Sequence, residues 1–108
     1  MSSELAPVAL FAYNRPNHLR SALTSLAANL EARRTALTIF CDGPRSEEDE
    51  RRVAQVRNVA HSSDVASLFA QVEVKEREAN VGLSTSVIEG VSRLLDTQSS
   101  VIVVEDDL

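Results

Sequence analysis

The chain contains few of the residues that mark several protein classes. Its 108 residues include one cysteine, no tryptophan and one lysine, and its net charge is −5. The single Cys41 cannot form an internal disulfide, so nothing indicates an oxidising compartment. We interpret Cys41, which lies within an apolar run, as a small buried hydrophobic residue. The acidic balance argues against nucleic-acid binding, because no basic surface is available to neutralise phosphates.

Long apolar runs and the common phosphate-binding motifs are also missing. No run approaches the roughly 18–20 apolar residues of a membrane span, and the N-terminus lacks the basic and apolar regions of a signal peptide. We therefore expect a cytoplasmic protein. The sequence has neither Gly-x-Gly-x-x-Gly after its first apolar run nor Gly-Lys-Ser/Thr anywhere. A bound polyphosphate would thus need a metal ion rather than a glycine-rich loop.

Apolar runs of strand length alternate with stretches of helical periodicity along the chain. Strands are expected at 8–13, 37–41, about 72–74 and 100–105. The three expected helices begin near Pro16, Ser46 and Gly82 or Ser84. Their buried faces would be Leu19, Leu23, Leu26 and Leu30, then Val53, Val56 and Ala60, then Val87, Val91, Leu94 and Leu95. Segment 61–70 is ambiguous, although Ser63 and Asp64 could cap one more short helical turn.

This order predicts a single α/β domain over residues 1–108, with a parallel sheet and helices on its faces. The third strand alternates valines with charged residues, which favours a position at the sheet edge. The fourth is a continuous apolar run, which is typical of a strand buried on both faces. In such sheets, ligands bind beyond the carboxyl ends of the strands.

Polar residues cluster at each expected strand end. The clusters are Tyr13-Asn14-Arg15, Asp42-Gly43, residues 77–82 and Glu105-Asp106-Asp107. The last places three carboxylates directly after an apolar run, and adjacent carboxylates repel one another unless a cation lies between them. Oxygen ligands suit Mg²⁺ or Mn²⁺, which in turn bind phosphates. The sequence therefore predicts a metal-assisted phosphate site at this edge, although the Asp42 and Asn80 segments could equally be plain turns.

Four motifs in this order resemble the nucleotide-binding half of a glycosyltransferase of the GT-A fold. They are Asn-Arg-Pro (14–16) after the first strand, Cys-Asp-Gly-Pro (41–44), Asn-Val-Gly-Leu-Ser (80–84) and Val-Val-Glu-Asp-Asp-Leu (103–108). The similarity is to family 2-like enzymes and to the alpha-1,3-mannosyl-glycoprotein N-acetylglucosaminyltransferase type. It implies a Rossmann-like three-layer fold with a mostly parallel four-stranded sheet in the order 3-2-1-4.

The resemblance also implies roles for the matching residues. Tyr13, Asn14 and Arg15 would wall the base and ribose. Asp42 would accept a hydrogen bond from the base, and Asn80 and Gly82 would line the nucleotide pocket.

The acidic motif corresponds to the "DxD" motif of that family. Asp107 would bind Mn²⁺ or Mg²⁺ directly. Glu105, the other end of the motif, would bind the metal or, like Asp106, serve the ribose or the water shell of the metal.

The implied activity is transfer of a sugar from a nucleotide-diphosphate donor, with UDP-sugars favoured, to an acceptor hydroxyl. The catalytic base of inverting members comes from the second half of the fold, which we expect to be absent here. No catalytic residue is therefore assigned, and we expect a donor-binding fragment that is inactive alone. The exposed sheet edge beside the fourth strand would favour a homodimer.

Three other functions remain open from the sequence. A nucleotidyltransferase of related fold would usually carry a glycine-rich basic loop after the first strand, which this chain lacks. A phospho-acceptor signalling domain would need acids at the end of the first strand and a late lysine, whereas the only lysine is Lys75. The last alternative is a non-catalytic interaction domain with a vestigial acidic site.

Overall fold

A computed structural model describes residues 5–106. The elements follow the expected alternation of strands and helices. In chain order they are β1 (Val8–Ala12), α1 (Pro16–Ala27), the 3₁₀ turn η1 (Ala32–Arg34), β2 (Ala36–Cys41), α2 (Glu47–Ala60), α3 (Ser63–Ala66), β3 (Gln71–Glu76), α4 (Leu83–Leu95) and β4 (Ile102–Glu105). The ambiguous segment 61–70 thus contains a one-turn helix. Its N-cap is Ser62, whose side chain accepts a hydrogen bond from the Asp64 N–H.

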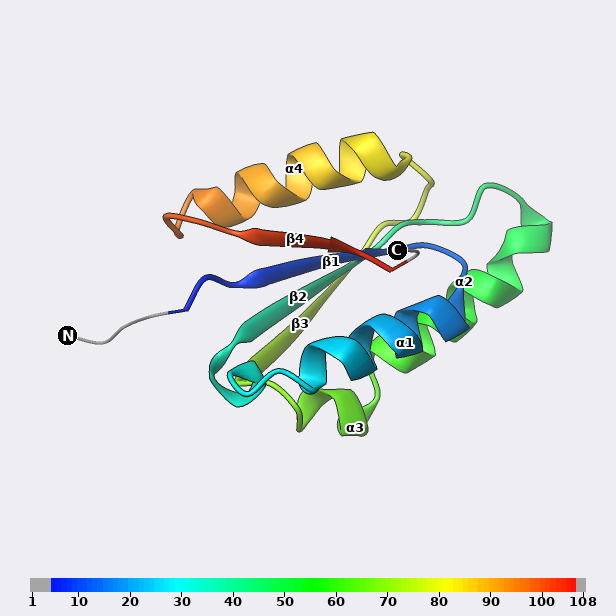
Figure 1. The fold of residues 1–108 in the computed structure, drawn as a ribbon. Coiled ribbons are helices and arrows are strands. Elements are labelled where there is room, and N and C mark those ends of the chain that lie inside the picture. The colour runs from blue at the N-terminus through cyan, green and yellow to red at the C-terminus, as the bar shows by residue number, and fades with distance from the viewer. Residues whose placement is uncertain (1–4, 107–108) are drawn as a thin grey trace.

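The four strands form one parallel sheet in the order β3-β2-β1-β4. This confirms the predicted α/β class and strand order, and it places β3 at an edge as expected. Helices α1, α2 and α3 cover one face of the sheet, and α4 covers the other (Figure 1). The fold is therefore Rossmann-like, with three layers and with all carboxyl strand ends at the same edge.

The main core lies between the sheet and helices α1–α3. Alternate residues of the two central strands face these helices, and Leu10 and Ile39 are fully buried there. Leu19 of α1 and Val56 of α2 pack against them, as their helical spacing predicts. Burial of this apolar surface is the main stabilising contribution to the fold.

The opposite face is held by a close contact between α4 and the two central strands. Phe11 of β1 stacks on Phe40 of β2 with ring centroids 4.9 Å apart. Gly90 of α4 lies directly over both rings, and a Cβ atom there would come within 3.0–3.1 Å of their edge carbons. Helix α4 therefore sits close over β1 and β2, and a larger residue at position 90 would require the two rings to shift.

Three predictions of burial are wrong. Leu30 is 99% exposed, because α1 ends at Ala27 and Leu30 no longer follows the helical face. In β4, which pairs with β1 alone among the described residues, Ile102 is 51% and Val103 is 42% exposed. Leu95 at the end of α4 is also exposed, whereas the smaller Ser86 and Gly90 are the buried residues of that helix.

Candidate functional site

A hollow of about 260 Å³ lies at the carboxyl ends of β1 and β4; we call it the strand-end hollow. The residues that line it come from β1 and the turn after it, the β2–α2 loop, the start of α4 and the end of β4. They are Phe11, Tyr13, Asn14, Arg15, Arg45, Leu83, Glu105 and Asp106. Five of the predicted site residues, Tyr13, Asn14, Arg15, Glu105 and Asp106, thus surround one space, as the rule for parallel sheets predicts.

The turn after β1 is fixed by one carboxylate of α2. The Asn14 side-chain amide donates to Asp49 Oδ1 at 2.9 Å, and the Arg45 backbone N–H donates to Asp49 Oδ2 at 3.2 Å. Asp49 therefore joins the β1–α1 turn to the β2–α2 loop. Asp49 also lies in the acidic first turn of α2, where its charge interacts favourably with the helix dipole. Ser46, near which this helix was expected to begin, is the N-cap residue of α2, although its side chain makes no capping hydrogen bond.

Arg45 lines the hollow but was not among the predicted site residues. Its guanidinium carbon lies 6.0 Å from the centroid of the Tyr13 ring, within the range of a cation–π contact. Its Nε also donates to Asn80 Oδ1 at 3.5 Å. The position of Arg45 in the sequence could have revealed it. It follows the Asp42-Gly43-Pro44 turn, at the edge of the sheet where ligands bind.

Asp42 holds two loops together at the end of β2. Its side chain is 6% exposed. Oδ1 accepts hydrogen bonds from the N–H groups of Gly43 at 2.8 Å and Val81 at 3.0 Å, and Oδ2 accepts one from Gly82 at 3.0 Å. Because ionised acceptors form strong hydrogen bonds, this carboxylate fixes the β3–α4 loop onto the end of β2.

Asn80 and two glycines complete this group, which we call the Asp42 cluster (Asp42, Gly43, Asn80, Val81 and Gly82). The Asn80 side-chain amide donates to the Gly43 carbonyl at 3.0 Å. A Cβ atom at Gly43 would lie 2.6 Å from the Ala79 carbonyl carbon, so only glycine permits this approach. Gly82 has φ of +86° and serves as the N-cap of α4. The three predicted residues of this cluster therefore lie beside the hollow and position its walls.

The acids at the end of β4 face the turn after β1. Glu105 is the register partner of Phe11, and the Asp106 N–H donates to the Phe11 carbonyl at 3.3 Å. Both side chains are half-buried. Asp107, the predicted direct metal ligand, lies outside the described residues.

The carboxylates at this edge supply only part of a metal-binding site. Within residues 5–106, no group of three His, Cys, Asp or Glu side chains lies close enough to hold a metal ion. Mg²⁺, however, is commonly bound by one or two carboxylates together with the phosphates of its substrate. Glu105 and Asp106 provide such oxygen atoms, so the residues fit a metal that arrives with a phosphate ligand.

Positively and negatively charged side chains line different sides of the strand-end hollow. Arg15 and Arg45 are exposed on the side of the β1 and β2 loops, and Glu105 and Asp106 lie at the end of β4. Arginines suit phosphate oxygens, and carboxylates suit a cation or hydroxyl groups. The hollow can therefore bind a ligand that carries both an anionic part and hydroxyl groups.

Comparison with known proteins establishes no family for this chain. No protein-family model matches it, and no curated protein sequence matches it significantly. None of the helices in residues 5–106 is long and apolar enough to cross a membrane. What the structure establishes is a small α/β domain with a parallel sheet of order 3-2-1-4.

Proposed function

We propose that this domain binds the nucleotide-diphosphate sugar of a glycosyl transfer reaction. The observation that carries the proposal is the convergence of two separate segments on one hollow. The Tyr13-Asn14-Arg15 turn and the Glu105-Asp106 acids are about ninety residues apart in the sequence. Both line the strand-end hollow. This convergence supports the resemblance that the four sequence motifs indicated.

Each side of the hollow suits a different part of such a donor. The Tyr13 ring offers a flat surface for a base, and the guanidinium groups of Arg15 and Arg45 suit the diphosphate. Glu105 and Asp106 would hold a ribose hydroxyl or a Mn²⁺ or Mg²⁺ ion, with Asp107 as the further ligand. Asp42 and Asn80 would act mainly by holding the loops that form the walls. A UDP-sugar remains the favoured donor.

In the proposed reaction, an acceptor hydroxyl attacks the anomeric carbon as the bond to the diphosphate breaks. The metal, when bound, would neutralise charge that develops on the leaving diphosphate. The residues of this chain bind and orient the donor and exclude water from one side of it. We assign no catalytic base among them, so the domain alone is proposed to bind the donor without transferring the sugar.

Isothermal titration calorimetry with UDP and GDP tests this proposal. We expect saturable binding in Mn²⁺ that is lost in EDTA and in Asp107→Ala. Arg45→Ala should weaken binding about tenfold or more, because it removes a charged contact to phosphate. Asp96→Ala, which removes an exposed carboxylate at the far end of α4, is the matched control and should bind as the wild type does.

Two results would overturn the proposal. The first is no heat of binding with either nucleotide in Mn²⁺ for a protein whose circular dichroism shows it to be folded. The second is binding that Arg45→Ala and Asp107→Ala leave as strong as Asp96→Ala does, because the nucleotide would then lie elsewhere. Preference for UDP over GDP would support the favoured donor.

A further inference from the structure

A cavity larger than the strand-end hollow lies away from it, between α4 and the outer strand β3. Its volume is about 680 Å³, and we call it the α4–β3 cavity. Helix α4 covers this face of the sheet and lies against Phe11 of β1 and Phe40 of β2 at Gly90. Within residues 5–106, no helix lies over β3 on this side (Figure 1), and the cavity occupies the space beside α4.

An aromatic ring and a lysine from neighbouring strands line the sheet side of the cavity. Phe40 of β2 is half-buried there, with one face stacked against Phe11. Its register partner on β3 is Lys75, so the ammonium group and the ring lie on the same face of the sheet. A flat apolar group could contact Phe40 while a charged group on the same molecule reaches the cations around it.

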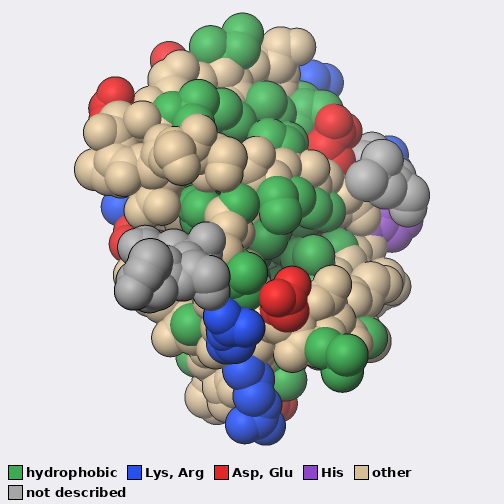
Figure 2. All heavy atoms as spheres, turned by 60° about the vertical axis from the view of Figure 1, so that its left-hand side comes forward, with side chains coloured by type: hydrophobic (Ala, Val, Ile, Leu, Met, Phe, Trp, Pro, Cys, Tyr) green, Lys and Arg blue, Asp and Glu red, His purple; other side chains and the backbone are tan. Residues whose placement is uncertain are grey.

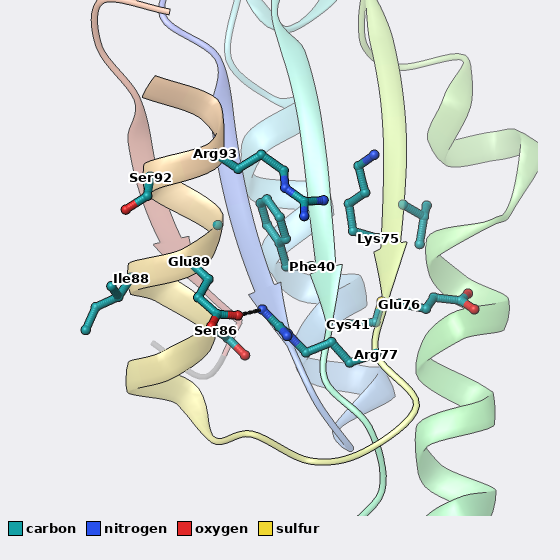
Figure 3. Close-up of a pocket in the computed structure, with 12 residues that line it drawn as sticks. Phe40, Cys41, Lys75, Glu76, Arg77, Ser86, Ile88, Glu89, Ser92 and Arg93 are labelled. Carbon is teal, nitrogen blue, oxygen red and sulfur yellow. Dashed lines mark hydrogen bonds and ion pairs between the residues drawn. The ribbon is translucent and has the colours of Figure 1, made fainter. Parts of the chain in front are cut away.

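Three cations line the cavity, and two of them already have acidic partners. Arg77 pairs with Glu89 of α4, which closes one end of the space (Figure 3). Lys75 pairs with Glu73 at 3.2 Å. Arg93 makes no ion pair or side-chain hydrogen bond within residues 5–106. Figure 3 shows its guanidinium group extending from α4 across Phe40 toward β3.

A buried hydroxyl without a partner provides a second, independent observation. Ser86 lies two turns before Arg93 on α4 and is 6% exposed. Its Oγ atom has no hydrogen-bond partner in the described part of the chain, although the residue lines the cavity. A buried polar group without a hydrogen bond destabilises a protein, so its presence beside a cavity points to a ligand that completes the bond.

We propose that the α4–β3 cavity is a second binding site, for a small molecule that joins a flat apolar group to an anionic group. The apolar group lies on Phe40. The phosphate or carboxylate of the ligand accepts hydrogen bonds from Arg93 and from the Ser86 hydroxyl. The site is independent of the proposed donor site, because the two share no lining residue.

Amide chemical shifts, measured by NMR during titrations with phenyl phosphate, benzoate and phenol, test the proposal. We expect phenyl phosphate or benzoate to shift the amides of Phe40, Lys75, Ser86 and Arg93 saturably. Phenol, which lacks the charge, should bind at least about tenfold more weakly. The stronger of the two anions identifies the phosphate or the carboxylate as the natural group.

Two variants at the site and one control elsewhere test which residues contact the ligand. Arg93→Gln should weaken anion binding about tenfold or more, whereas Arg51→Gln, at an exposed position on α2, should not change it. Ser86→Ala should weaken binding about two- to tenfold and yet raise the Tm of the ligand-free protein by roughly 4–8 °C, because it removes an unpaired buried hydroxyl. If Ser86 served only the fold, its replacement would not weaken ligand binding while raising the Tm.

The proposal would be overturned if neither anion shifted these amides saturably. It would also be overturned if Arg93→Gln and Arg51→Gln bound phenyl phosphate equally well. Shifts confined to Tyr13, Asn14 and Glu105 would assign the anion to the strand-end hollow instead and would contradict a second site. If the calorimetric experiment detected no nucleotide binding, the proposal of a second site in the α4–β3 cavity would be unaffected.

Discussion

Replacement of Asp42 by asparagine tests whether a single carboxylate holds the loops beside the strand-end hollow. The asparagine oxygen can still accept from Gly43 and Val81, but its NH₂ group would face the Gly82 N–H, which now donates to Oδ2 at 3.0 Å. One hydrogen bond to a charged group is then lost, a buried donor lacks an acceptor, and the other two bonds weaken. Because each such bond contributes about 1.5–3 kcal/mol, we expect the free energy of unfolding to fall by about 2–4 kcal/mol.

Urea denaturation followed by far-ultraviolet circular dichroism measures this change, which should appear as a lower midpoint at constant m value. Amide exchange should accelerate most at Gly82, whose N–H loses its acceptor, and less at Val81, whose hydrogen bond weakens. Asp96→Asn, at an exposed position, is the control and should change the free energy by no more than about 0.5 kcal/mol. If Asp42→Asn were as mild as the control, the Asp42 cluster would not hold the loops.

Two further predictions concern Cys41 and the sheet edge. Burial, with a smaller contribution from the Glu76 charge, raises the pKa of the Cys41 thiol to about 12, against about 8.5 in an unfolded chain. The unfolded chain therefore loses this proton first, and the free energy of unfolding should fall by roughly 1.4 kcal/mol per pH unit above about pH 8.5. Urea titrations should show a shallower decline in Cys41→Ala, and equal slopes would contradict the assignment. We also expect homodimers through β4, where Ile102 and Val103 are exposed; Figure 2 shows hydrophobic side chains gathered over α4 and β4. Val103→Lys should give monomers by light scattering, and a wild type that is monomeric at every concentration would refute this.

The sequence predicted the arrangement of elements well, because periodicity records which face of an element is buried. Val53, Val56 and Ala60 of α2 are buried at the expected spacing, and the valines of β3 alternate with exposed charges. The wrong predictions concern positions whose burial depends on distant neighbours. β4 is as apolar as a central strand, yet it pairs only with β1 in the described chain. Hydrophobicity indicates what a strand could bury and not whether another element covers it.

Helix α4 shows a different limit of sequence reasoning. Its large apolar residues predicted a buried face, but the buried residues of α4 are Ser86 and Gly90, and Gly90 lies against Phe11 and Phe40. A glycine inside a helix usually counts against the helix, and nothing in the sequence pairs it with two aromatic residues on separate strands. That contact also leaves β3 uncovered, so the α4–β3 cavity could not have been predicted from the chain.

The candidate site was found because the carboxyl ends of parallel strands meet at one edge, yet this rule does not distinguish residues that bind from residues that support. Asp42 and Glu105 are both acids that directly follow or end a strand. In the structure, Asp42 is 6% exposed and accepts three backbone N–H groups, whereas Glu105 lines the hollow. Backbone groups in tight loops need acceptors, so some polar residues at any such edge must serve the loops.

This difference decides which variants can test nucleotide binding. Asp42→Asn is expected to loosen the β3–α4 loop, so a loss of UDP binding in that variant would follow whether or not Asp42 touches the base. Arg45 and Glu105 line the hollow. Arg45 is exposed, so its substitution should leave the fold intact. A loss of binding in Arg45→Ala at unchanged unfolding free energy is therefore evidence for contact with the ligand, and the same loss in Asp42→Asn is not.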